Sequence, residues 1–277
     1  MKRRDFILAG LALGLVGAPA AASAAPFTPS RFSVEVRGSG PDVILIPGLT
    51  AGRDVWTGTV AAVPGYRYHL IQVAGFAGDP ARGNREGAVI GPLADEIARY
   101  IAANRLARPA IVGHSMGGTL AMMIGARYPA LAGRIMVVDM LPQPAGLLGG
   151  RATDPFVGQL QRYFATPGGR RLFTSFMTVF SPPDSSHGRS DPDVVARAMH
   201  ELAGTDLTPQ LARIRAPLSV VYASPDPRAN AAVDRTFAGA YANAHGPRFV
   251  RIGNSGHMVM LDQPARFRAA LRDFLRR

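Results

Sequence analysis

Short apolar runs alternate with longer amphipathic stretches along the chain from Pro26 onward. The runs are rich in β-branched residues and are separated by Gly/Pro turns, which is typical of strands, and several are apolar throughout, as expected of strands covered on both faces. Strands in regular alternation with helices predict an α/β fold with a mostly parallel sheet and crossover helices. The expected strands are Arg31–Val36, Val43–Ile46, Tyr68–Val73, Ala110–Val112, Ile135–Asp139, Leu218–Tyr222 and Phe249–Ile252.

Three stretches between or after these runs are expected to be helices that flank the sheet. Ile90–Asn104 and Gln263–Leu275 carry apolar residues at helical spacing. A third helix is expected from Gly118, with Pro129 closing it.

One connection is much longer than the others. The chain between Asp139 and Leu218 far exceeds the roughly dozen residues that a crossover helix needs. We therefore expect an α/β core over residues 25–140 and 205–277, and a helical cap inserted over residues 141–204. Most aromatic residues of the cap are expected to hold it to the core, and a few to face the site.

The N-terminus has the outline of a signal peptide. Lys2-Arg3-Arg4 precedes the apolar stretch Phe6–Val16, and Ala22-Ser23-Ala24 supplies a small-residue cleavage site. We therefore expect residues 1–24 to be removed and the protein to be periplasmic or secreted. Residues 3–7 resemble a twin-arginine export signal, with an ordinary secretory signal as the alternative. The apolar stretch is shorter than the roughly 20 residues of a spanning helix, so no membrane span is expected after its removal.

Composition narrows the classes of partner and chemistry. Lys and Arg number 31 against 19 Asp and Glu, a net charge of +12, and the only lysine is Lys2. The arginines are scattered and no nucleic-acid fold signature occurs, so we expect a small-molecule substrate and no nucleic acid. An envelope protein that uses this charge at anionic lipid is an alternative. The absence of cysteine excludes disulfides, thiolate metal sites and a cysteine nucleophile.

The pattern Gly113-His114-Ser115-Met116-Gly117 is the main candidate for chemistry. It lies between an expected strand and an expected helix, the context of a nucleophile elbow, in which small neighbours let a strained serine stand above the sheet. Ser115 is the expected nucleophile. The oxyanion hole needs two backbone N–H groups, which we expect from Met116 and from Leu49, after Pro47-Gly48.

A serine nucleophile needs a base and an acid that orients the base. His257 lies in a Gly/Ser loop just after the last expected strand and is the expected base. Asp226 follows the preceding strand and is the expected acid, which gives the chain order Ser, Asp, His. Its chief rival is Asp139, at the end of another strand, because strand-end acids occur at either point in serine-triad folds.

The motifs Val43–Leu49, Gly75–Gly78, Gly113–Gly118 and Gly256-His257 together resemble the α/β-hydrolase superfamily over nearly all of the mature chain. The resemblance implies a mostly parallel eight-stranded sheet with a helical cap, and hydrolysis through an acyl-enzyme. Asp206–Leu211 is similar to the segment before the acid-bearing turn in capped members, which supports Asp226. Pro47 departs from the histidine that many members carry there. Ala223-Ser224-Pro225 departs from the glycine and charged residues that they often carry. Neither departure removes a catalytic group.

These features indicate a serine hydrolase, esterase-like, that acts on a small to medium, largely apolar substrate. We expect no cofactor and no metal, because no dinucleotide fingerprint, phosphate loop or zinc-protease motif is present. Serine at the elbow argues against haloalkane dehalogenase and epoxide hydrolase chemistry. Amide hydrolysis, carbon–carbon bond hydrolysis and cofactor-free perhydrolysis stay open, since the same triad serves them. The alternative of another class is a catalytically silent ligand-binding protein. The sequence predicts no oligomeric state.

Overall fold

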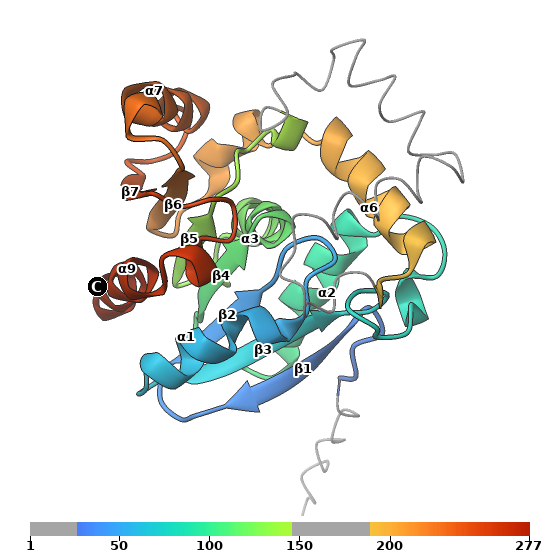
Figure 1. The fold of residues 1–277 in the computed structure, drawn as a ribbon. Helices are drawn as coiled ribbons and strands as arrows, with labels where there is room; N and C mark the ends of the chain where they lie inside the picture. Colours follow the sequence, from blue (N-terminus) through green and yellow to red (C-terminus); the bar gives the residue numbers. More distant parts are fainter. Residues whose placement is uncertain (1–26, 146–188) are drawn as a thin grey trace, which may run out of the picture.

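A computed structural model describes residues 27–145 and 189–277. Within them the strands form one sheet in the order β1-β3-β2-β4-β5-β6-β7, in which β1 alone is antiparallel (Figure 1). The predicted signal peptide and residues 146–188 of the predicted cap lie outside the described residues.

All seven strands predicted from the sequence are confirmed. They are β1 (Phe32–Arg37), β2 (Asp42–Ile46), β3 (Arg67–Val73), β4 (Ala110–His114), β5 (Arg134–Val138), β6 (Leu218–Ser224) and β7 (Arg248–Gly253). The count of eight that the resemblance implied is one too many for the described residues, where the sheet has seven strands. At the antiparallel end of the sheet, β1 pairs with β3 on one side and is the edge of the sheet on the other.

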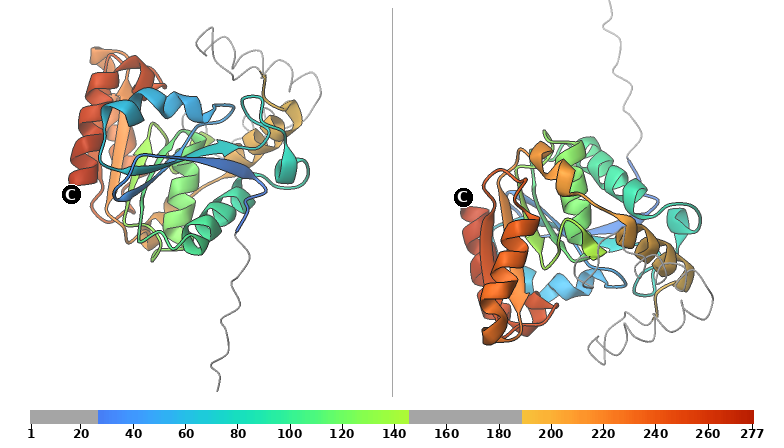
Figure 2. Two further views of the ribbon diagram at one scale, coloured as in Figure 1. Left: turned by 90° about the horizontal axis from the view of Figure 1, so that it is seen from below. Right: turned by 90° about the horizontal axis from the view of Figure 1, so that it is seen from above.

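Helices cover both faces of this sheet (Figure 2). They are α1 (Thr57–Ala62), α2 (Ile90–Ala103), α3 (Met116–Arg127), α6 (Pro192–Gly204), α7 (Asn230–Ala240), α8 (Val259–Asp262) and α9 (Pro264–Arg276). The three predicted helices correspond to α2, α3 and α9. Helix α3 begins two residues before the predicted start at Gly118, directly after the elbow serine.

Alternate residues of the central strands belong to two separate hydrophobic cores, one on each face of the sheet. Ile44 and Ile46 of β2 join the cluster beneath α2 and α3, while Val43 and Leu45 join the cluster beneath α1 and α9. Successive side chains of a strand point to opposite faces, so an apolar run without polar interruption fits a strand covered on both sides. This double burial fixes the carboxyl ends of β2, β4 and β5, from which the candidate site is built.

Helix α6, gold in Figure 1, belongs to the predicted insertion and packs on the core beside α2. Asp191 caps its start by accepting from the N–H groups of Asp193 and Val194. The Glu201 carboxylate accepts from the N–H groups of Val89 and Ile90 at the start of α2, at 2.6 and 2.9 Å. The last part of the insertion is therefore anchored to the sheet domain.

In the parts of the chain that the structure describes, no helix combines the length and the apolar character needed to cross a membrane.

Candidate active site

Ser115 forms a sharp turn between β4 and α3. Its φ of 53° and ψ of −124° are unusual for a residue with a side chain and carry conformational strain. The turn is held from both sides, since the Ser115 N–H donates to the Val138 carbonyl at 2.9 Å and the Ser115 carbonyl accepts from the Gly118 N–H at 2.7 Å. The nucleophile elbow expected from the sequence is therefore present in the backbone.

The glycines on either side of Ser115 are required by space. A Cβ atom at Gly113 would lie 2.0 Å from the Gly117 carbonyl oxygen, and one at Gly117 would lie 2.3 Å from the Ile46 carbonyl oxygen. Real Cβ atoms essentially never approach so closely. The G-x-S-x-G spacing thus reflects the close contact of the turn with itself and with the end of β2.

The loop after β2 passes directly against the elbow. A Cβ atom at Gly48 would lie 3.1 Å from Ser115 Cβ and 3.0 Å from His114 Nδ1. Leu49 follows this contact point, and Met116 opens α3, where first-turn N–H groups have no partner within the helix. Both residues expected to supply the oxyanion hole therefore lie in the backbone next to Ser115.

Ser190, from the described end of the insertion, links two loops near the site. Its hydroxyl donates to the Thr50 carbonyl at 3.3 Å and accepts from the Ala77 N–H at 3.0 Å. Thr50 and Ala77 both have positive φ, 62° and 54°. The link stabilises two strained turns, one of which follows the expected oxyanion donor Leu49.

His257 lies in the loop between β7 and α8, with its side chain 46% exposed. Its Nδ1 atom is 2.7 Å from Asp139 Oδ2. Asp139 directly follows β5, and its side chain is only 10% exposed. Its second carboxylate oxygen accepts from the Ala223 N–H at 2.9 Å, and its own N–H donates to the Val221 carbonyl at 2.7 Å. The carboxylate is therefore fixed between β6 and the histidine.

The expectation that Asp226 orients His257 is wrong in this structure. Asp226 is exposed, and its carboxylate accepts from the Arg228 N–H at 2.8 Å, which caps the short helix Pro227–Ala229. Such a local cap is a common use of aspartate before proline. Asp139, which the sequence offered as the rival, takes the position because it ends the strand adjacent to β4, which leads to Ser115.

Tyr241 supports the turn that carries Asp139. It is fully buried, and its hydroxyl donates to the Met140 carbonyl at 2.7 Å. Burial raises the pKa of the Tyr241 hydroxyl well above its ordinary value, and the negative charge of Asp139 adds to this effect. The sequence alone gave no signal that a tyrosine one hundred residues away would contact this turn.

His114 is a second residue whose role the sequence did not indicate. It is buried at the end of β4, and its Nε2 atom lies 2.9 Å from the backbone oxygen of His257. The two imidazole rings are 4.7 Å apart between centroids and inclined at 47°. Because His114 adjoins Ser115 in the chain, this contact places the base loop directly beside the elbow.

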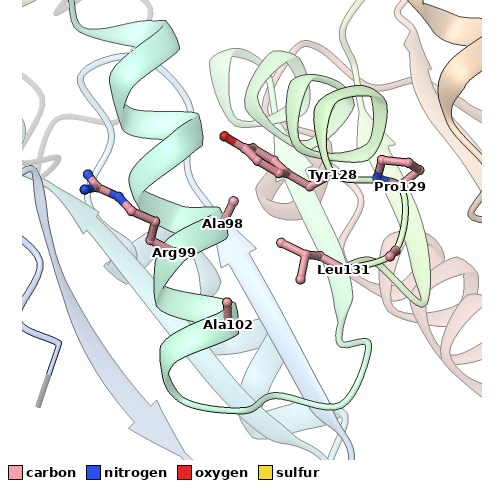
Figure 3. Close-up of a pocket in the computed structure, with 7 residues that line it drawn as sticks. Ala98, Arg99, Ala102, Tyr128, Pro129 and Leu131 are labelled. Atoms are coloured by element: carbon pink, nitrogen blue, oxygen red, sulfur yellow. The ribbon is translucent and has the colours of Figure 1, made fainter. Parts of the chain in front are cut away.

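The described residues contain no group of three or more His, Cys, Asp or Glu side chains suited to bind a metal ion. An apolar groove lies elsewhere, between α2 and the segment after α3 (Figure 3). It is lined by Ala98, Arg99, Ala102, Tyr128, Pro129, Ala130 and Leu131. Helix α3 separates this groove from Ser115 by its length of about 18 Å, so the groove is not part of the candidate active site.

Comparison with known proteins identifies the family of the chain. Residues 43–270 match the Alpha/beta hydrolase family. Over 111 residues, 40% of this chain and 42% of the relative's length, the chain is 32% identical to a pimeloyl-acyl-carrier-protein methyl ester esterase of Aeromonas hydrophila. A protein of the same name from Aromatoleum aromaticum is 24% identical over 85% of this chain and 98% of its own.

A solved structure shares the fold over most of its length. The enol-lactonase from Burkholderia xenovorans LB400 superposes with a TM-score of 0.69 at 19% identity, covering 89% of this chain and 96% of that one. At this identity the likeness concerns the fold alone. Since the family match covers most of the chain, the protein is a member of the alpha/beta hydrolase family and a hydrolase.

Proposed function

We propose that the protein is a serine hydrolase that cleaves an ester of a small to medium, largely apolar substrate through an acyl-enzyme. Ser115 is the nucleophile, His257 the base and Asp139 the acid that orients the base. The observation that carries this proposal is the 2.7 Å contact between His257 Nδ1 and Asp139 Oδ2, in a loop that also touches the elbow through His114.

The arrangement supports a two-step mechanism. Because a carboxylate only accepts, His257 Nδ1 carries a proton and Nε2 is free to act as base. Nε2 takes the Ser115 hydroxyl proton while Oγ bonds to the acyl carbon, and the N–H groups of Leu49 and Met116 stabilise the oxyanion. The imidazolium then protonates the leaving alcohol as the ester bond breaks. Water, deprotonated by His257, attacks the acyl-enzyme, and Ser115 recovers its proton as the acid is released.

Ester substrates are favoured by the relatives. The two curated relatives described above are named as methyl ester esterases. The superposed structure is named as an enol-lactonase, and a lactone is a cyclic ester. Amide hydrolysis, carbon–carbon bond hydrolysis and perhydrolysis would use the same three residues. A silent binding protein would have no need for the carboxylate that is fixed against His257.

Turnover of p-nitrophenyl acetate by the purified protein tests this proposal. An acyl-enzyme that forms faster than it is hydrolysed releases a burst of p-nitrophenolate, and both burst and steady turnover should vanish in Ser115→Ala. Ser219→Ala is the matched control, because Ser219 lies near the start of β6, the opposite end from the site. Wild-type protein that is folded and inactive towards esters, amides and peracids alike would favour the silent binding protein instead.

We further propose that the protein is exported to the periplasm or beyond by its N-terminal signal, with the twin-arginine pathway as the first choice. The support is the sequence Lys2-Arg3-Arg4 ahead of an apolar stretch. Replacing Arg3 and Arg4 by lysine should leave the protein unprocessed in the cytoplasm if the pathway is twin-arginine. Unchanged processing of this variant in cell fractions would indicate an ordinary secretory signal.

A further inference from the structure

His114 sits where three segments of the candidate site meet. The residue ends β4 and is 2% exposed. Its ring packs against the ring of His257, and its Nδ1 edge faces Gly48, where an added Cβ would come within 3.0 Å. One imidazole therefore contacts the base loop and the loop that leads to Leu49, while its own backbone continues into Ser115.

The protonation of His114 follows from its partner. Its Nε2 atom lies 2.9 Å from the backbone oxygen of His257. A carbonyl oxygen can only accept a hydrogen bond, so Nε2 must carry the proton and donate it. The Nε2–H group of His114 is therefore bonded to the main chain of His257, the proposed base.

Side chains from other segments hold the loop that carries His257. It begins after Gly253 and includes Asn254 with a φ of 55°. Its start is tied by Gln263, whose side-chain amide donates to the Asn254 carbonyl at 2.7 Å. At His257 itself, Asp139 holds the side chain and His114 holds the main chain. The first contact sets the orientation of the imidazole, and the second sets the position of the backbone from which it projects.

We propose that His114 is a positioning residue that fixes the base relative to the nucleophile through the bond from its Nε2–H to the His257 carbonyl. This inference rests on the proposed function. Because His114 and Ser115 share a peptide bond, the main chain of the base is linked to the nucleophile by one hydrogen bond and one residue. Loss of that bond leaves Asp139 to orient a ring whose backbone has moved.

Two substitutions separate the hydrogen bond from the bulk of the ring. Glutamine places an amide nitrogen close to the position of Nε2 and retains a donor, whereas methionine has a similar size and no donor. His114→Met is expected to lower kcat by about 10- to 100-fold with KM little changed, because small displacements of reacting groups have effects of this size. His114→Gln is expected to keep kcat within about threefold of the wild type, since its geometry is retained.

His69 provides a matched control for the loss of a buried imidazole. It is 3% exposed on β3, and its Nε2 atom lies 2.8 Å from the carboxylate of Asp42, at the start of β2 and away from the site. His69→Met and His69→Gln are expected to lower Tm and to leave kcat and KM unchanged. If kcat falls in His114→Met and not in His69→Met, with the same fraction of folded protein, the loss comes from the site and not from the removal of a buried imidazole.

The outcomes are distinct. If the wild type shows no Ser115-dependent turnover, the proposed function fails. If the wild type is active and folded His114→Met matches its kcat, or if His114→Gln is as impaired as His114→Met, the positioning role is overturned. The ¹⁵N NMR spectrum of the wild-type histidines provides a measurement that does not depend on a variant folding. It should show His114 with its proton on Nε2, and a proton on Nδ1 alone would overturn the inference.

Discussion

Asp139 Oδ2 lies 2.7 Å from His257 Nδ1, although 118 positions separate the two residues in the chain. The pairing joins the end of β5 to the loop after β7, and the Ala223 N–H holds the other oxygen of the same carboxylate. With Ser115 directly after the neighbouring strand β4, the three residues of the proposed triad follow the carboxyl ends of three strands. The chain order is Ser, Asp, His, with the aspartate one strand earlier than the sequence had indicated.

Exchange of each aspartate for asparagine should distinguish the two candidate acids. An amide at position 139 would donate to His257 Nδ1 and force the ring proton onto Nε2, where it blocks the base. Asp139→Asn should therefore lower kcat by about 10⁴-fold, the loss known for such a change in a serine triad. Asp226→Asn should leave kcat unchanged, because Asp226 is exposed and bonds to Arg228.

The measurement is steady-state hydrolysis of one ester by both variants, with circular dichroism to compare folding. A severe loss in Asp226→Asn together with a mild one in Asp139→Asn would contradict the structure and return the acid to Asp226.

The error over the acid shows what the sequence could and could not provide. Ser115 and His257 could be singled out as candidates because each lies in a short glycine-bearing motif next to a strand. Asp139 and Asp226 are both aspartates just after a strand, and their difference lies in three-dimensional partners. Asp139 is held by the backbone of β6, while Asp226 caps a short helix that the Pro at position 227 begins.

The close packing around Gly48 leads to a second prediction. An alanine there would place its Cβ 3.1 Å from Ser115 Cβ and 3.0 Å from His114 Nδ1, so these side chains or the loop that leads to Leu49 must give by a few tenths of an ångström. Because the oxyanion donors must be well placed, Gly48→Ala should lower kcat by about 10- to 100-fold. The check is kcat at saturating substrate.

Gly239→Ala is the control, since no atom lies within 4 Å of the added Cβ and the residue is in α7. It should leave kcat unchanged and raise the free energy of unfolding by up to about 1 kcal/mol, because glycine weakens a helix relative to alanine. Equal kcat values for Gly48→Ala and Gly239→Ala would refute a close approach of the β2 loop to the nucleophile.

Tyr241 should make the protein less stable in alkali. Its pKa is raised by burial, so the unfolded chain loses this proton from about pH 10 while the folded chain keeps it. Its stabilising effect is therefore complete below about pH 10 and declines as the pH rises above that value. Tyr222, whose pKa is raised to about 12 by burial and by its bond to Asp234, contributes in the same direction.

Tyr241→Phe should remove part of this alkaline decline and leave the Met140 carbonyl without its donor. At pH 7 the variant should be less stable by about 1–3 kcal/mol, the cost of an unsatisfied buried group. Urea unfolding at pH 7 and above pH 10 measures both effects. An identical pH dependence in the variant and the wild type would rule out Tyr241 as a source of the decline.

Glu201 should anchor the described end of the insertion. Its carboxylate accepts from the N–H groups of Val89 and Ile90 at the start of α2, where negative charge is favourable. Glu201→Gln should lower the free energy of unfolding by about 1–2 kcal/mol, because one charge-assisted acceptor is lost. The exposed Glu86 is the control, and Glu86→Gln should be neutral in urea unfolding. A neutral Glu201→Gln would mean that α6 is held by its other contacts, among them the bonds from Arg197 to the Asn84 and Arg85 carbonyls.

The fold was more predictable than the site. The central strands follow from apolar runs that are buried on both faces, as in β2, where Val43 and Ile44 enter different cores. The edge strands β1 and β7 are only partly buried and follow from their β-branched residues and bounding turns. The elbow glycines at 113 and 117 were also explained by close contact. Contacts between distant segments, such as Tyr241 with Met140 and His114 with His257, carry no local pattern and were found only in three dimensions.

Covalent labelling by a fluorophosphonate probe tests the central claim most directly, because the probe reacts only with a serine activated by a base. Intact mass and peptide mapping should show one adduct, on Ser115, absent from Ser115→Ala and much slower to form in His257→Gln and Asp139→Asn. Labelling of folded wild-type protein at another residue, or none at all, would contradict a serine hydrolase with Ser115 as its nucleophile.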